Sequence, residues 1–183
     1  GLQGLEMASA CFERAVVYAR ERVQGNNILA GKDPDAKPVT IIHHPDIRRK
    51  LMWMKAHVEG LRAMCYYVAC CMDKAKVAQN AQEKDKWNGY VELLIPVVKA
   101  YTTDKGFLIC SMAMDVLGGY GYCSEYPIEQ YLRDEKIATI YEGTNGIQAM
   151  DLLGRKLRQR DGDNTRALFS DIAGNAAAAK KVP

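Results

Sequence analysis

Apolar residues recur at intervals of three and four positions through most of this chain, and this helical period constrains the fold more than any other feature. A stripe of this kind places one apolar face along an amphipathic α-helix. The longest regular stripe is made of Ile47, Leu51, Met54, Val58, Leu61, Cys65, Val68 and Met72. Residues 2–23 and 87–117 carry similar stripes. No segment shows the alternation of a half-buried β-strand, so we expect no sheet.

Turn-forming residues divide the chain into helices. We expect long helices over about 2–23, 45–77, 87–117 and 145–158, and a weaker one over 165–173 before a frayed tail. Glycine, asparagine and proline between residues 24 and 43 indicate a long loop, and residues 78–86 form a polar connection. Pro96 should kink the third helix or mark its first turns. Together these elements predict an all-α, up-down four-helix bundle with a short additional C-terminal helix.

Size and charge narrow the class of protein. The 183 residues are 48% hydrophobic, which is enough apolar material for one core. The formal net charge is only +3, and basic and acidic residues are interleaved, so binding to nucleic acid or to a membrane surface is not indicated. No run of 18 apolar residues exists, so we expect no stable membrane insertion.

Neither the cysteines nor the histidines suggest a metal or disulfide framework. The six cysteines contain no Cys-x-x-Cys pair and fall mostly inside apolar helical patterns, so we interpret them as reduced core thiols. Reduced thiols indicate a cytosolic or matrix-like compartment. His43 and His44 lack a third ligand at a suitable spacing, so we expect no metal site.

Two short segments could carry chemistry, but the residues alone leave their roles open. Glycines at 118, 119 and 121 could bring backbone close to a ligand, although a helix end and turn is the more common explanation of such a pattern. Glu142 lies between apolar neighbours, which favour a raised pKa and a general base. It also precedes a predicted helix with Thr144 as N-cap, where an ordinary glutamate is common.

The run from 115 to 148 resembles the C-terminal signature of acyl-CoA dehydrogenases. Its four markers come in the family's order: Leu-Gly-Gly-x-Gly-Tyr at 117–122, Glu-Tyr-Pro at 125–127, Leu-Arg-Asp-x-Lys-Ile at 132–137, and Ile-Tyr-Glu-Gly-Thr at 140–144. The Ala-Arg-Glu-Arg run at 19–22 is similar to another family segment. The continuation at 145–157 resembles the larger members, which include enzymes acting on methylmercaptopropionyl-CoA. We therefore expect a C-terminal helical-bundle domain at 1–158 and the start of a truncated C-terminal extension at 159–183.

The resemblance implies an FAD-dependent reaction that converts an acyl-CoA thioester to a trans-2-enoyl-CoA. Glu142 matches the glutamate that removes the α-proton, and its neighbours Tyr141 and Gly143 match positions that line the acyl site. Thr144 matches a residue that contacts FAD. Arg22 and Gly119 match residues that reach the FAD of a neighbouring subunit, so the resemblance also implies a homodimer or homotetramer.

The resemblance further implies an electron-transfer flavoprotein as acceptor, and a bacterial-type cytoplasm or the mitochondrial matrix as location. Two positions depart from the family: Asp115 and Gly146 stand where many members have glutamine. An alternative reading is a non-catalytic relative that acts as a binding or assembly module. The sequence lacks the family's N-terminal helical domain and middle β-domain, so we expect these 183 residues alone neither to bind FAD tightly nor to turn over acyl-CoA.

Overall fold

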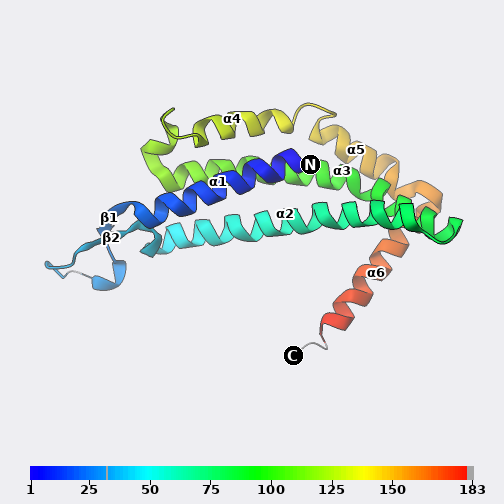
Figure 1. The fold of residues 1–183 in the computed structure, drawn as a ribbon, viewed down its shortest axis with the longest axis horizontal. Helices are drawn as coiled ribbons and strands as arrows, with labels where there is room; N and C mark the ends of the chain where they lie inside the picture. The colour runs from blue at the N-terminus through cyan, green and yellow to red at the C-terminus, as the bar shows by residue number, and fades with distance from the viewer. Residues whose placement is uncertain (32, 181–183) are drawn as a thin grey trace. The chain divides into compact units, whose positions relative to one another are not determined.

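A computed structural model describes residues 1–31 and 33–180 of the chain, and helices dominate it (Figure 1). The α-helices are α1 (Leu2–Glu21), α2 (Pro45–Val77), α3 (Ala81–Leu117), α4 (Ile128–Ala138), α5 (Asn145–Gly154) and α6 (Asp163–Ala179). Short 3-10 helices are η1 (Ile28–Ala30), η2 (Ile41–His43), η3 (Gly118–Tyr122) and η4 (Lys156–Gly162). The predicted all-α class is confirmed. No helix in the described ranges is long and apolar enough to span a membrane.

The chain divides into two compact units. Unit 1 consists of Gly1–Arg62 and Tyr101–Glu142, and unit 2 consists of Ala63–Ala100 and the residues from Gly143 onward. The α-helical segments of unit 1 are α1, the first part of α2, the last part of α3, and α4. Unit 2 holds the remaining parts of α2 and α3 together with α5, η4 and α6. The boundary predicted at 158 falls inside η4 and stays a prediction.

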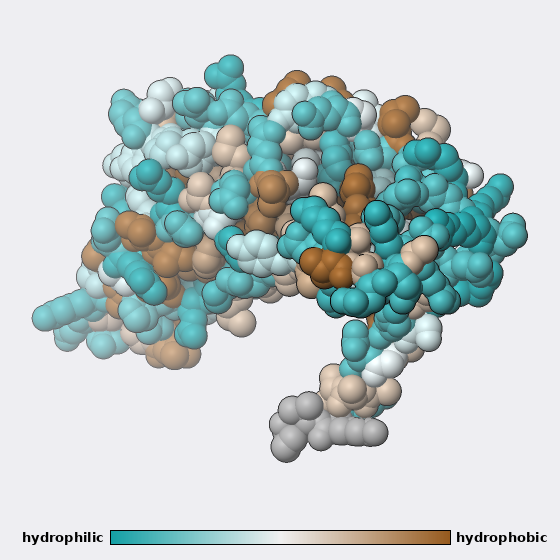
Figure 2. All heavy atoms as spheres, turned by 45° about the vertical axis from the view of Figure 1, so that its right-hand side comes forward, coloured by the Kyte–Doolittle hydropathy of each residue, from teal (hydrophilic) through white to brown (hydrophobic). Residues whose placement is uncertain are grey.

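The core of unit 1 is made from the faces that the helical period marks. Small residues line α1 at this core, which lets neighbouring helices approach closely. Buried apolar residues of the unit include Leu5, Ala8, Cys11, Ala15 and Ala19 of α1, Leu51, Met54, Val58 and Leu61 of α2, Ile109, Cys110 and Ala113 of α3, and Ile128 and Ala138 of α4. Apolar side chains also remain on the surface, as the brown spheres in Figure 2 show.

The expectation that no strand forms was wrong. Strands β1 (Val23–Asn26) and β2 (Pro38–Thr40) pair antiparallel, with Val23 opposite Thr40. One backbone and one side-chain contact close the hairpin: the Ile41 amide donates to the Arg22 carbonyl at 2.8 Å, and the His44 ring atom Nε2 lies 2.7 Å from the Gln24 carbonyl oxygen. All four residues of β1 are exposed. A hairpin without a buried face needs no apolar alternation, so the sequence pattern did not indicate it.

Helix α3 begins six residues earlier than predicted, at Ala81 rather than Trp87. Asn80 Oδ1 accepts a hydrogen bond from the Glu83 amide at 2.9 Å, and Glu83 Oε2 accepts one from the Gln79 amide at 3.1 Å. This cap satisfies one amide of the first helical turn and one amide just before the helix, so the polar segment joins the helix. Pro96 lies inside α3, which continues past it.

Unit 2 has its own small core, to which α6 contributes. Leu168 of α6 packs with Cys71, Tyr90 and Leu93, and all four are buried. Helix α6 runs from Asp163 to Ala179, so the prediction of a helix ending near 173 was too short. Helix α5 ends at Gly154 rather than 158, and η4 follows.

Candidate functional site

The segment between α4 and α5 makes a sharp left-handed turn at Glu142 and Gly143. The backbone φ angles are 54° at Glu142 and 82° at Gly143. Non-glycine residues rarely adopt a positive φ, so the backbone conformation of Glu142 is uncommon. A Cβ at Gly143 would lie 2.7 Å from Gln148 Nε2, which itself donates to the Gly143 carbonyl at 3.3 Å. Glycine at 143 therefore satisfies both the conformation and the close contact.

The Glu142 side chain is exposed, and its carboxylate has no hydrogen-bond or ion-pair partner among the described residues. Its apolar neighbours Ile140 and Tyr141 are also exposed, at 51% and 36%. Within this chain, Ile140 and Tyr141 therefore do not shield the Glu142 carboxylate from water, although the sequence had suggested that they would. What the chain supplies is an unpaired carboxylate at a fixed turn.

Both flanks of this turn are tied to helices. On the unit 1 side, the Tyr141 hydroxyl donates a hydrogen bond to Gln3 Oε1 in the first turn of α1. On the unit 2 side, Thr144 is the N-cap of α5, as predicted, and its Oγ1 accepts from the Ile147 amide at 3.2 Å. Lys99 Nζ of α3 donates to Asn145 Oδ1 at 2.8 Å. These contacts restrain the backbone on each side of Glu142.

Arg22 and the glycine turn form a second group, also in unit 1. Arg22 caps α1, and its guanidinium carbon lies 5.2 Å from the centroid of the Tyr120 ring in η3. Arg22 Nε is buried and has no hydrogen-bond partner among the described residues. Gly118 has a φ of 62°, and Gly119 is exposed beside it. The tyrosine ring also packs with Tyr18 at 6.4 Å between centroids.

Within unit 1, the predicted site residues fall into two groups, which lie at opposite ends of α1. Tyr141 contacts Gln3 near the start of this helix, and Arg22 caps its end. At a rise of ~1.5 Å per residue, the 19 steps between Gln3 and Arg22 separate the two ends by about 28 Å.

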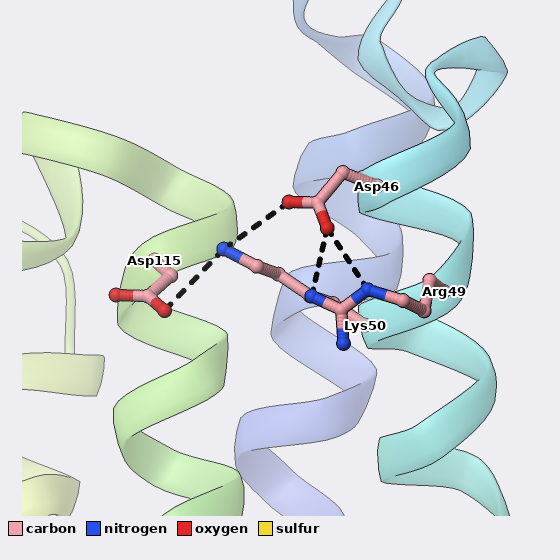
Figure 3. A network of polar contacts seen from close by, with 4 residues as sticks. All are labelled: Asp46, Arg49, Lys50 and Asp115. Carbon is pink, nitrogen blue, oxygen red and sulfur yellow. Dashed lines mark hydrogen bonds and ion pairs between the residues drawn. The ribbon is translucent and has the colours of Figure 1, made fainter.

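Asp115 takes part in a network of charged side chains rather than lying free (Figure 3). Its Oδ2 lies 3.3 Å from Lys50 Nζ, which is also 3.6 Å from Asp46 Oδ2. Arg49 donates to Asp46 Oδ1 from Nη2 at 2.7 Å and from Nε at 3.0 Å. The hydrogen bonds from Arg49 hold the pKa of Asp46 below its usual value. Asp115, which stands where many family members have glutamine, thus forms an ion pair that joins α2 and α3.

Sequence reasoning missed Glu135, which is fully buried in unit 1 on α4. Neither carboxyl oxygen has a hydrogen-bond partner in the described part of the chain. Burial raises the pKa of this carboxyl to about 8. The helical period could have revealed it, because Glu135 lies seven residues after Ile128 and three before Ala138, and both are buried. In the Leu-Arg-Asp-x-Lys-Ile motif Glu135 occupies the variable position x, so the motif did not mark it as a functional residue.

Comparison with known proteins gives a consistent result. The family model described as acyl-CoA dehydrogenase, C-terminal domain, matches residues 1–157. A broad-specificity linear acyl-CoA dehydrogenase from Mycobacterium tuberculosis is 41% identical over 162 residues, covering 86% of this chain and 26% of the relative. The 3-methylmercaptopropionyl-CoA dehydrogenase of Ruegeria pomeroyi is 37% identical over 172 residues, covering 94% of this chain and 28% of the relative.

Solved structures agree with this match. The butyryl-CoA dehydrogenase of Megasphaera elsdenii superposes with a TM-score of 0.64 at 31% identity, covering 85% of this chain and 34% of that one. The chain thus spans about a quarter to a third of the length of these relatives. The likeness is to their C-terminal helical part.

Proposed function

The chain belongs to the acyl-CoA dehydrogenase family, whose C-terminal domain it matches over residues 1–157, and on this premise we propose that it serves an FAD-dependent α,β-dehydrogenation of an acyl-CoA thioester. In this proposal Glu142 removes the α-proton, and the product is a trans-2-enoyl-CoA. The observation that carries the proposal is the exposed, unpaired carboxylate of Glu142, held in a left-handed turn between two anchored helices.

The geometry of this turn suits a general base. A thioester α-proton is weakly acidic, so its removal needs a carboxylate at a fixed position, near groups that stabilise the developing enolate oxygen. The hydrogen bond from Tyr141 to Gln3 and the cap at Thr144 restrain the backbone on both sides of the carboxylate. The Glu142 carboxylate forms no ion pair with another of the described residues, so it is available to a substrate. Tyr141 and Gly143, its direct neighbours, would line the acyl site.

Groups that suit a flavin nucleotide are present in both units. The buried Nε of Arg22 lacks an acceptor among the described residues, and a diphosphate oxygen would supply one. The exposed backbone at Gly119 leaves room for a ligand to approach. Thr144 Oγ1 accepts from a backbone amide, so its hydroxyl proton remains available as a donor. FAD, when bound, would accept the β-hydrogen as a hydride.

The separation of these groups supports a homo-oligomer. Arg22 and Gly119 lie about 28 Å from the α1 end that carries the base segment, as judged from helix rise. A flavin whose ring lies beside Glu142 cannot also bring its diphosphate to Arg22 of the same copy, because the ribityl chain between ring and diphosphate is far shorter than this separation. We therefore propose that Glu142 and Thr144 serve one flavin, and that Arg22 and Gly119 serve the flavin of a neighbouring copy in a homodimer or homotetramer. An electron-transfer flavoprotein is the proposed electron acceptor.

The decisive test is turnover by the full-length protein that carries this sequence, assayed with acyl-CoA substrates and an artificial electron acceptor. Glu142→Gln keeps the shape of the side chain but cannot accept the proton, so kcat should fall by about 10²- to 10⁴-fold. The matched control is Glu59→Gln, an exposed glutamate of α2 that forms an ion pair with Lys55 one turn away. It should leave kcat unchanged.

Retention of full activity by Glu142→Gln would refute the assigned base. A full-length protein without any activity toward acyl-CoA would instead support the alternative of a non-catalytic relative. The 183-residue chain alone should neither retain stoichiometric FAD nor turn over substrate, because it spans about a quarter of its relatives' length.

A further inference from the structure

Glu135 is an acidic side chain placed where three helices of unit 1 meet. It lies on α4, it is fully buried, and neither oxygen finds a hydrogen-bond donor among the described residues. An ionised carboxylate without donors is strongly disfavoured in such surroundings. A neutral carboxylic acid is tolerated there, because it needs only one hydrogen-bond acceptor for its proton.

Two glycines make room for this side chain. A Cβ at Gly106 of α3 would lie 2.5 Å from Glu135 Oε1 and 2.9 Å from the backbone oxygen of Gly4. A Cβ at Gly4 of α1 would lie 3.0 Å from the same Oε1 and 2.9 Å from the backbone oxygen of Thr102. Both helices thus present glycine to the carboxyl group, and both bring backbone oxygens to the same small space. Those oxygens are acceptors, which is what a protonated carboxyl requires.

The charged and titratable groups near Glu135 do not stabilise its ionised form enough to offset burial. Cys110 of α3 interacts with Glu135, and Cys11 of α1 lies beside Cys110. The hydrogen bond with Cys11, together with burial, raises the pKa of the Cys110 thiol, so this thiol stays neutral. Burial sets the pKa of Glu135 at about 8.

We propose that Glu135 is a positioning residue that acts as a neutral carboxylic acid, donating to a backbone oxygen of Gly4 or Thr102 and so fixing α4 against α1 and α3. Glu142 follows it by seven residues, and only the end of α4 and one short turn lie between them. Fixing α4 therefore fixes the start of the segment that carries the carboxylate. This role rests on the proposed function of Glu142 as base, whereas the protonation state of Glu135 does not.

Two measurements on the full-length protein test the two parts separately. The first is the infrared C=O band of a protonated carboxyl group at neutral pH, compared between the wild type and Glu135→Gln. The second is kcat against pH. Ionisation of Glu135 releases α4, so wild-type kcat should fall about tenfold per pH unit on the alkaline side of its pKa. Glu135→Gln stays neutral and keeps a donor, so this alkaline fall should disappear while KM changes less than about twofold.

Glu6→Gln is the matched control, because Glu6 is an exposed glutamate of α1. It should keep both the infrared band and the alkaline fall. Gly106→Ala gives a second approach that does not change charge: its Cβ would displace the carboxyl group, so kcat should fall about tenfold with KM nearly unchanged.

The proposal is overturned if Glu135→Gln leaves the protonated-carboxyl band in place, or if the alkaline fall of kcat persists in this variant. It is also overturned if Gly106→Ala has full kcat. These outcomes are distinct from failure of the proposed function. An active Glu142→Gln variant would remove the base role and leave the infrared band of Glu135 unaffected.

Discussion

The Tyr141 hydroxyl donates a hydrogen bond to the side-chain oxygen of Gln3, and this contact joins the base segment to the first turn of α1. The two residues are 138 positions apart in the sequence. Position 141 therefore has two properties: its ring borders the proposed acyl site, and its hydroxyl fixes the backbone next to Glu142. Helix α1 in turn joins this segment to Arg22 at its other end.

Tyr141→Phe separates these two properties, because it keeps the ring and removes the hydroxyl. The lost hydrogen bond is partly exposed, so the free energy of unfolding should fall by about 1 kcal/mol or less. The base segment loses a restraint, so kcat should fall even though the loss of unfolding free energy is small. Thermal unfolding and steady-state kinetics of the full-length protein measure the two effects. Tyr122→Phe is the control, since Tyr122 is 81% exposed; equal kinetics in both variants would contradict the restraint.

Glu135 should make stability depend on pH. Its folded-state pKa of about 8 is above the ordinary value of 4.5. The unfolded state therefore binds fewer protons between these values, and stability decreases as pH rises through this window. The loss should approach at most about 1.4 kcal/mol per pH unit and level off above pH 8. Denaturant unfolding at several pH values should show a difference between Glu135→Gln and wild type that grows with pH. A constant difference would contradict the raised pKa.

The sequence predicted much of the fold, because long apolar stripes need a helical partner whatever the details of packing. The stripe on α2 is the clearest case: Leu51, Met54, Val58 and Leu61 are all buried. The hairpin was missed because its backbone hydrogen bonds leave no trace in side-chain hydropathy. The start of α3 was missed because a polar cap, Asn80 with Glu83, resembles a loop in composition.

The candidate site was predictable only in part. The ordered motifs pointed to Glu142, and the N-cap at Thr144 followed from local residue preference. The left-handed backbone at Glu142 could not be read from a glutamate, which rarely adopts it. Glu135 depends on Gly4 and Gly106, which are far from it in sequence, so only the tertiary contact reveals why a carboxyl group fits there.

A hydrogen bond from the hydroxyl of a buried tyrosine contributes to the docking of α6 in unit 2. Tyr90 is fully buried, and its hydroxyl donates to Asp171 Oδ2 at 2.8 Å; Lys86 Nζ lies 2.9 Å from the same oxygen. Tyr90→Phe should lower the free energy of unfolding of unit 2 by about 1.5–3 kcal/mol, as for a hydrogen bond to a charged group. Limited proteolysis should then cleave within α6 sooner. Tyr66→Phe is the control, because Tyr66 is 65% exposed; it should change neither the free energy of unfolding nor the rate of cleavage in α6. Unchanged proteolysis of Tyr90→Phe would contradict the role of the hydrogen bond to Asp171.

Arg22→Lys tests the second group of site residues. Lysine keeps the positive charge but loses the Nε donor, which is buried and has no acceptor among the described residues. If a flavin diphosphate is that acceptor, the full-length protein should lose FAD more readily by about 1.5–3 kcal/mol of binding free energy. Flavin fluorescence released on dilution measures this loss without any assay of turnover. Arg20→Lys, two residues earlier on an exposed position of α1, is the control. Equal FAD retention in both variants would show that Arg22 faces no diphosphate. If dissociation of the oligomer and loss of FAD occur in parallel in Arg22→Lys, the arginine acts across copies.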